Sequence, residues 1–330
     1  MTKIRYLILP ILTSLVIWVL NTRIGALPPL GKFLDPFHGY LALVGSDDLN
    51  RLNIETPQLE SPVTIIFDSL RIPHIFAEND HDLYFMQGYV MASERLWQME
   101  FQTHAAGGRM SEIVGEKALG YDRFQRRVGM KFGAENSLNA IEKDQQLSPM
   151  ADAFTEGINT YIASLPEDQY PLEYKILDYA PELWTPLKTS LLLKYMAWML
   201  TGRNTELTYT RMWNEMGQDV IEELFPIYPW FVDPIIPPGT KYDFESLPLD
   251  QPPNLYQSKT DRGNMITKSH DGIGSNNWVV TGSRTESGNA LLANDPHLGL
   301  SLPSIWYAMH LVSPNQNVMG VSLPGAPGII

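Results

Sequence analysis

A polar segment at residues 236–274 divides the chain and limits how it can fold. The segment is punctuated by Pro, Gly and Ser, and its few apolar residues follow neither the helical nor the strand period. Such a segment buries too little apolar surface to form a core of its own. We therefore expect an exposed linker between two folded parts, residues 27–235 and 275–330.

The part before the linker is expected to be mainly helical. Two β-branched runs, 63–67 and 72–76, predict a short hairpin. Asn79 or Asp80 then caps a helix whose apolar residues recur at helical spacing up to the pair Gly107–Gly108. The same criteria predict further helices that begin at Ser148–Pro149, at Thr185–Pro186, at Glu206 and at Asp219.

After the linker the pattern changes to that of strands. We expect strands at 277–281 and 290–293 around a Gly/Ser-rich turn, and a longer one at 305–312. A helical part followed by a β part predicts the α+β class.

Residues 1–26 have the pattern of an export segment. Lys3 and Arg5 precede an apolar run at 6–20, and Ile24-Gly25-Ala26 follows it. Both a cleaved signal peptide and a retained membrane anchor fit this pattern. The remaining chain is then expected outside the cytoplasm, in the periplasm.

Composition excludes several classes of site. The chain has 24 Lys and Arg against 37 Asp and Glu, a net charge of -13, which repels nucleic acid. It has no Cys, so disulfides, thiol nucleophiles and Cys-ligated zinc are excluded.

Ser275 opens the β part, in the stretch DGIGSNNWVV. The motifs that activate a serine, such as G-x-S-x-G, do not surround it. Cleavage of the Gly274–Ser275 bond would free an α-amine with a pKa of about 7.7–8.0, a base beside its own hydroxyl. Gly274 would aid the cut, since it lacks a Cβ and tolerates strained angles. The alternative is an ordinary Gly-Ser pair at the start of a strand.

At these residues the chain resembles the penicillin amidase family of N-terminal-nucleophile hydrolases. Three stretches carry the resemblance in the family's order: 71–115, the sequence Ser275-Asn276-Asn277-Trp278, and 289–300. The resemblance implies a four-layer αββα fold, self-cleavage before Ser275 and removal of 236–274. It also implies a heterodimer of the two resulting chains, α and β.

The resemblance assigns roles to individual residues. Ser275 is expected to be both nucleophile and base of an amide hydrolase, with His297 orienting the serine or a leaving group. A His after Asp-Pro is otherwise a turn residue. Glu206 resembles a calcium-ligating glutamate of the family, although Ca²⁺ takes about six to eight oxygen ligands. The resemblance also implies an acyl pocket formed by Met196, Leu200 and Leu298. The alternative interpretation is that these three are ordinary core residues.

The resemblance leaves the substrate open. Candidates are β-lactam side chains, N-acyl homoserine lactones and acylated peptides, and Met199 stands where penicillin G acylases carry an arginine. Because the family's oxyanion-hole residues lie further downstream, we expect the N-terminal part of a longer precursor. The alternatives are a membrane-anchored scaffold that never matures and a conventional serine hydrolase that requires His297.

Overall fold

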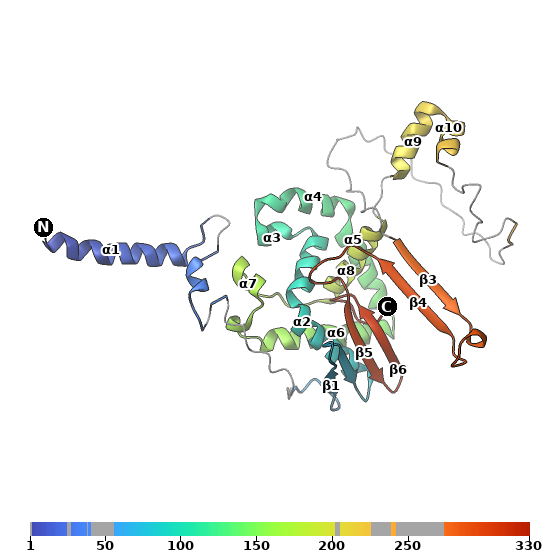
Figure 1. Cartoon of the computed structure of the whole chain (residues 1–330), viewed down its shortest axis with the longest axis horizontal. Coiled ribbons are helices and arrows are strands. Elements are labelled where there is room, and N and C mark those ends of the chain that lie inside the picture. The colour runs from blue at the N-terminus through green and yellow to red at the C-terminus, as the bar shows by residue number, and fades with distance from the viewer. Residues whose placement is uncertain are drawn as a thin grey trace. The chain divides into compact units, whose positions relative to one another are not determined.

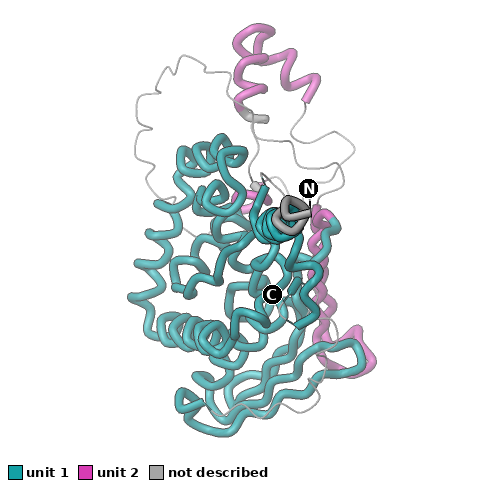
Figure 2. Tube along the Cα trace, turned by 90° about the vertical axis from the view of Figure 1, so that its left-hand side faces the viewer, with its two compact units in different colours: residues 1–197, 300–330 teal, residues 198–299 magenta. Residues whose placement is uncertain are grey.

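The computed structural model describes residues 2–24, 28–37, 39–40, 56–201, 205–225, 239–241 and 274–330. The chain divides into two compact units, one of residues 1–197 and 300–330 and the other of residues 198–299 (Figure 2). Both helices and strands are present, so the expected α+β class is confirmed. Most of the predicted linker, 236–274, lies outside the described residues.

Helix α2 (Asp80–Gly107) is the centre of the first unit and has the predicted bounds. The side chain of Asn79 accepts a 2.7 Å hydrogen bond from the backbone N–H of Asp82 and so caps the helix. At the other end Gly108 adopts a left-handed conformation with φ of 64°, which ends the helix. Side chains all around α2 are buried, as expected of a helix surrounded by other elements.

Helix α6 (Leu147–Ser164) packs on α2 at very close range (Figure 1). A Cβ placed on Gly157 would overlap the backbone carbonyl of Phe85, and one placed on Gly88 would overlap the carbonyl of Phe154. Two glycines on facing helices therefore set the distance between α2 and α6. The predicted start of α6 at Ser148 is off by one residue, because Asp144 caps the backbone N–H of Leu147.

A four-stranded sheet covers another side of α2. Its order is β1-β2-β5-β6, with β2 and β5 parallel and the outer pairs antiparallel. Ile75, Met309 and Leu311 point from one face into the core that α2 also lines. The strands are β1 (Thr64–Phe67), β2 (Pro73–Phe76), β5 (Tyr307–Ser313) and β6 (Gln316–Ser322).

The remaining helices of the first unit surround this core. The sequence did not predict the helices between α2 and α6, nor strand β6. The elements are α3 (Met110–Val114), α4 (Leu119–Val128), α5 (Met130–Ile141), α7 (Leu172–Leu177), α8 (Pro186–Thr201), and the 3-10 turns η1 (Leu30–Phe33), η3 (Glu116–Ala118) and η4 (Glu167–Gln169).

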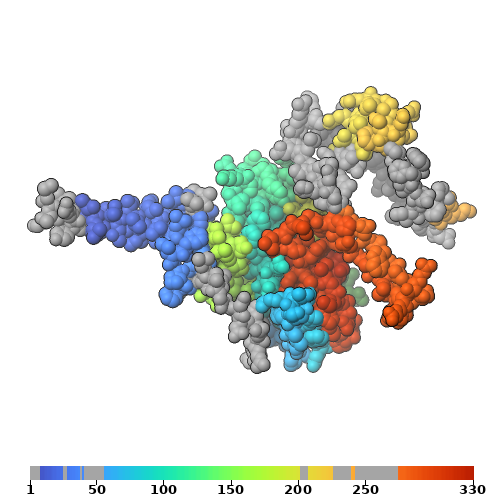
Figure 3. Space-filling model, viewed as in Figure 1, coloured from blue at the N-terminus to red at the C-terminus, as the bar shows by residue number. Residues whose placement is uncertain are grey.

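The predicted export segment contains helix α1 (Thr2–Asn21). Its apolar side chains from Ile8 to Trp18 are exposed, and α1 lies in the blue part of the space-filling view in Figure 3. Within the described ranges, no helix has both the length and the apolar character to cross a bilayer.

In its described residues, the second unit contains the end of α8, two further helices and a hairpin. The helices are α9 (Thr205–Met216) and α10 (Gln218–Leu224), close to the predicted ranges. Strands β3 (Gly274–Val280) and β4 (Leu291–His297) pair antiparallel around the turn η5 (Gly282–Arg284). Both strands are longer than predicted.

Candidate active site

The β3–β4 hairpin fixes where Ser275 lies relative to His297. Gly274 pairs with His297, Ser275 with Pro296, and Asn276 with Asp295. Directly paired residues share a face of the ribbon and neighbours along a strand alternate. The Ser275 side chain therefore lies on the Pro296 face, and His297 lies one pair away on the opposite face.

The Ser275 hydroxyl turns back toward the peptide bond that cleavage would break. Its Oγ donates a 2.7 Å hydrogen bond to the carbonyl oxygen of Gly274. Gly274 is not among the residues with positive φ, and a Cβ on it would meet no heavy atom of the described chain within 4 Å. The expected steric need for glycine at 274 is therefore not seen.

His297 has a partner that the sequence did not reveal. Its Nε2 lies 2.9 Å from Oδ2 of Asp295, two residues earlier on the same face of β4. A carboxylate only accepts, so Nε2 is the donor in this contact. Residues two positions apart on a strand lie on the same face. The contact was therefore missed because the predicted strand ended before His297.

The predicted pocket residues lie in different surroundings. Met196 on α8 is partly buried and packs against the core of the first unit. Leu200, one turn later on α8, is 45% exposed, and Leu298 is half-buried just after β4. Met196 belongs to the first unit and Leu298 to the second, so an acyl pocket built from both stays a prediction.

Glu206 lies in the first turn of α9, and its side chain is outside the described residues. One carboxylate supplies at most two of the six to eight oxygens that Ca²⁺ binds. The calcium site therefore stays a prediction.

A buried ionic cluster in the first unit also holds groups able to ligate a metal. One ligand atom each from Glu100, His104 and Glu182 lies within 4.8 Å of the others. Glu182 is already paired, since Arg109 Nη2 lies 2.6 Å from Oε1 and Lys188 Nζ lies 3.2 Å from Oε2. Two cations beside the carboxylate oppose a metal ion, so this cluster is an ion-pair network.

Charge and burial shift the two carboxyl groups of this cluster in opposite directions. The hydrogen bonds from Arg109 lower the pKa of Glu182 to about 2. Burial raises the pKa of Glu100, even though Tyr174 donates a 2.6 Å hydrogen bond to its Oε2. Neither group lies in the unit that carries Ser275.

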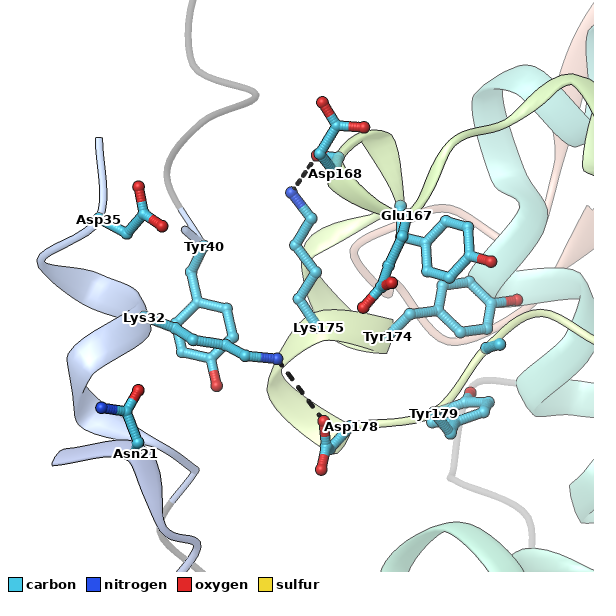
Figure 4. A pocket seen from close by; sticks show the side chains of 12 residues that line it. Asn21, Lys32, Asp35, Tyr40, Glu167, Asp168, Tyr174, Lys175, Asp178 and Tyr179 are labelled. Carbon is cyan, nitrogen blue, oxygen red and sulfur yellow. Dashed lines mark hydrogen bonds and ion pairs between the residues drawn. The ribbon is translucent and has the colours of Figure 1, made fainter. Parts of the chain in front are cut away.

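A large hollow in the first unit is lined by none of the predicted site residues. Its cavity volume is about 920 Å³, and side chains of the η1 region face those of η4 and α7 (Figure 4). Lys32 forms a 3.6 Å ion pair with Asp178, and Lys175 donates a 2.5 Å hydrogen bond to the backbone carbonyl of Asp168. The hollow is therefore polar, and its two lysines pair with acceptors that also line it.

An α+β chain with a serine at the start of a hairpin fits the class of hydrolases that the sequence resembles. Residues 62–330 match the family model described as penicillin amidase. The chain belongs to the penicillin amidase family, and the resemblance is confirmed.

Curated relatives are named as acylases. Acyl-homoserine lactone acylase QuiP of Pseudomonas aeruginosa is 32% identical over 82% of this chain and 32% of its own length. Penicillin acylase 2 proenzyme of Pseudomonas sp. strain SE83 is 30% identical over 84% of this chain and 35% of its own. The chain thus spans about a third of the length of these relatives.

A solved structure is also similar, the thermostable penicillin G acylase from Alcaligenes faecalis in tetragonal form. It shares 23% identity and a TM-score of 0.44, covering 58% of this chain and 98% of that chain. A TM-score of 0.44 does not test whether this chain has the expected four-layer αββα arrangement, which stays a prediction.

Proposed function

We propose that this chain is part of a self-processing acylase that hydrolyses the amide bond of small N-acylated molecules through an acyl-enzyme on Ser275. The observation that carries the proposal is the 2.7 Å hydrogen bond from the Ser275 hydroxyl to the Gly274 carbonyl, in a chain of the penicillin amidase family. The enzyme class is a hydrolase of linear amide C–N bonds.

Self-cleavage begins with attack by Ser275 Oγ on the carbonyl carbon of Gly274. The C–N bond breaks as the C–O bond forms, and the nitrogen takes up the proton that Oγ loses. The product is an ester in which Gly274 is linked through the Ser275 oxygen. Water then hydrolyses this ester, which leaves a Gly274 carboxylate and a Ser275 with a free α-amine.

The freed amine supplies the base for substrate hydrolysis. With a pKa of about 7.7–8.0, a useful fraction is neutral near pH 7.5 and accepts the hydroxyl proton. Oγ attacks the substrate carbonyl, the proton passes to the leaving amine, and water releases the acyl group from Ser275. The serine thus acts without a separate triad.

His297 is assigned a positioning role, with Asp295 holding its ring. In the uncut chain the imidazole and the Ser275 side chain lie on opposite faces of the hairpin. Cleavage makes Ser275 a chain end, which is then free to turn its hydroxyl toward the His297 face. A conventional serine hydrolase would instead require His297 with the Gly274–Ser275 bond intact.

The proposal includes the maturation products and their location. Residues 236–274 are removed, the α and β chains stay together as a heterodimer, and residues 1–26 direct export to the periplasm as a signal peptide or membrane anchor. Calcium bound through Glu206 stabilises the product. Substrates follow the relatives' names: N-acyl homoserine lactones and penicillins.

The test is release of the free amine from both substrate types by the full-length protein. Hydrolysis by the wild type, its loss in Ser275→Ala and its partial retention in His297→Ala support the proposal. No hydrolysis of any acyl homoserine lactone or penicillin by a cleaved, folded protein would contradict it, and an uncut, inactive protein would favour a scaffold. Activity that survives Ser275→Ala would remove the nucleophile assignment.

A further inference from the structure

Two histidines from distant parts of the sequence meet in the sheet of the first unit. His74 on β2 pairs in register with His310 on β5, and their Nδ1 atoms lie 2.9 Å apart. Both rings lie on the sheet face that points away from the α2 core, and both are partly exposed. The same cross-strand row continues to Met319 on β6, which pairs with His310.

The outer nitrogens of both rings lie near oxygen atoms. His310 Nε2 lies at hydrogen-bond distance, 2.8 Å, from Oδ1 of Asn317, and His74 Nε2 forms a longer 3.6 Å contact with Oδ2 of Asp68. The two Nδ1 atoms face each other and are close enough to contact a single ion.

This arrangement is that of two metal-ligating histidines. Ligating histidines characteristically donate the second ring N–H to a carboxylate or a carbonyl oxygen. His310 lies at hydrogen-bond distance from such an oxygen, and His74 lies 3.6 Å from a carboxylate. Ligands at right angles around an ion, each bonded at ~2.0 Å, lie ~2.8 Å apart, whereas tetrahedral ligands lie ~3.3 Å apart. The observed 2.9 Å separation fits the right-angle case, the tetragonal geometry of Cu²⁺.

We propose that His74 and His310, with Met319 as a third donor, form a copper-binding site on this sheet. Met319 is 59% exposed and pairs with His310, which places its side chain on the same face of the sheet as the two rings. Imidazole binds Cu²⁺ well, and a thioether favours Cu⁺ over harder cations.

Charge favours a cation here, in contrast to the Glu100 cluster. Asp68 places a carboxylate behind His74, where it accepts hydrogen bonds from the backbone N–H groups of Leu70 and Ile72. It therefore stays ionised and compensates part of the ion's charge. The site lies within the first unit and does not depend on Ser275 or on the proposed acylase activity.

The test is titration of the metal-free wild-type protein with CuSO₄ in a non-coordinating buffer, followed by EPR. We expect one tightly bound Cu²⁺ whose spectrum shows hyperfine coupling to two imidazole nitrogens. His74→Gln and His310→Gln should each weaken binding at least 100-fold. Asp68→Asn, which keeps an oxygen for Leu70 and Ile72, should weaken it about 10–100-fold because the carboxylate beside His74 loses its charge.

The matched control is His81→Gln, which changes another partly exposed histidine of the same unit and should leave copper affinity unchanged. Met319→Leu should weaken Cu⁺ binding about tenfold, measured by competition with a chromogenic chelator under reducing conditions. Equal copper affinity in the wild type, His74→Gln and His310→Gln would overturn the site. If these variants fail to fold, a wild-type spectrum without two-nitrogen coupling overturns it equally.

Discussion

The hydroxyl of Ser275 donates a 2.7 Å hydrogen bond to the carbonyl oxygen of Gly274, the residue just before it. Self-cleavage requires the hydroxyl to move from this oxygen to the carbon that bears it. The hydrogen bond therefore holds the hydroxyl beside the carbonyl group that it would attack.

The open surroundings of Gly274 predict that alanine is accepted there. Gly274 lacks a positive φ, and its Cβ position is unobstructed by the described residues. In the full-length protein, Gly274→Ala should therefore cleave at a rate within roughly threefold of the wild type. Mass spectrometry of a time course measures the rate, with uncleaved Ser275→Ala as the reference. A folded Gly274→Ala protein that stays uncut would show that glycine is needed for the reaction itself.

The contact between Asp295 and His297 predicts that they act as one unit. Asp295→Asn should lower kcat/KM for amide hydrolysis roughly tenfold, because the imidazole loses the group that orients it. His297→Ala should have a similar effect, and the double variant should be no worse than His297→Ala alone. Purely additive losses in this double-mutant cycle, or an unchanged pH profile of activity in Asp295→Asn, would show that the two residues act independently.

The low pKa of Glu182 predicts a pH-dependent loss of stability. The hydrogen bonds from Arg109 lower this pKa from 4.5 to about 2, so the carboxylate stabilises the fold above pH 4.5 and loses that effect as the pH falls through 2. Because Glu182 is partly exposed, Glu182→Gln should cost about 1–2 kcal/mol at pH 7 and much less near pH 2.

Urea unfolding at several pH values measures this difference. Glu112→Gln is the matched control, since Glu112 also pairs with Arg109 but is more exposed, and it should cost under about 0.5 kcal/mol. A Glu182→Gln cost that does not change with pH would mean that packing, and not charge, accounts for it.

The close contact of α2 and α6 predicts an unusual cost for alanine. Gly157→Ala gains helix propensity but drives its Cβ into the Phe85 carbonyl, so it should destabilise the protein by about 1–3 kcal/mol. Gly133→Ala, on α5 with only the Lys194 side chain nearby, should stabilise by up to about 1 kcal/mol. Thermal unfolding of both variants checks this contrast, and similar shifts would show that the helices separate easily.

The proposed calcium site predicts a loss of stability on chelation. Removing Ca²⁺ from the processed protein should lower Tm by roughly 2–8 °C, and added Ca²⁺ should restore it. Glu206→Gln should abolish this response, whereas Glu215→Gln, an exposed glutamate on the same helix, should retain it. A Tm that does not respond to chelation would contradict the proposed calcium site.

Local signals explain what the sequence predicted correctly. The capping side chain of Asn79 and the glycine pair at 107–108 fix both ends of α2 through contacts within a few residues. The hairpin of β1 and β2 likewise depends on a turn of neighbouring residues, in which Asp68 accepts from Ile72. Residues that are close together in the sequence are therefore enough to predict such elements.

Contacts between distant residues account for what was missed. β6 carries Gln316, Asn317 and Gly320, so its strand character depends on pairing with β5 rather than on propensity. The parallel pairing of His74 with His310 joins residues 236 positions apart, and no local sequence pattern predicts this pairing. In the candidate site, Ser275 and His297 were predicted from motifs, but their opposite faces follow only from the strand register.

The most direct test of the account is the intact mass and N-terminal sequence of the full-length protein purified from the exported fraction. The account predicts a chain that begins Ser-Asn-Asn-Trp, which would give Ser275 its free α-amine. An uncut polypeptide that spans Gly274 and Ser275, recovered folded, would contradict self-processing and with it the proposed mechanism.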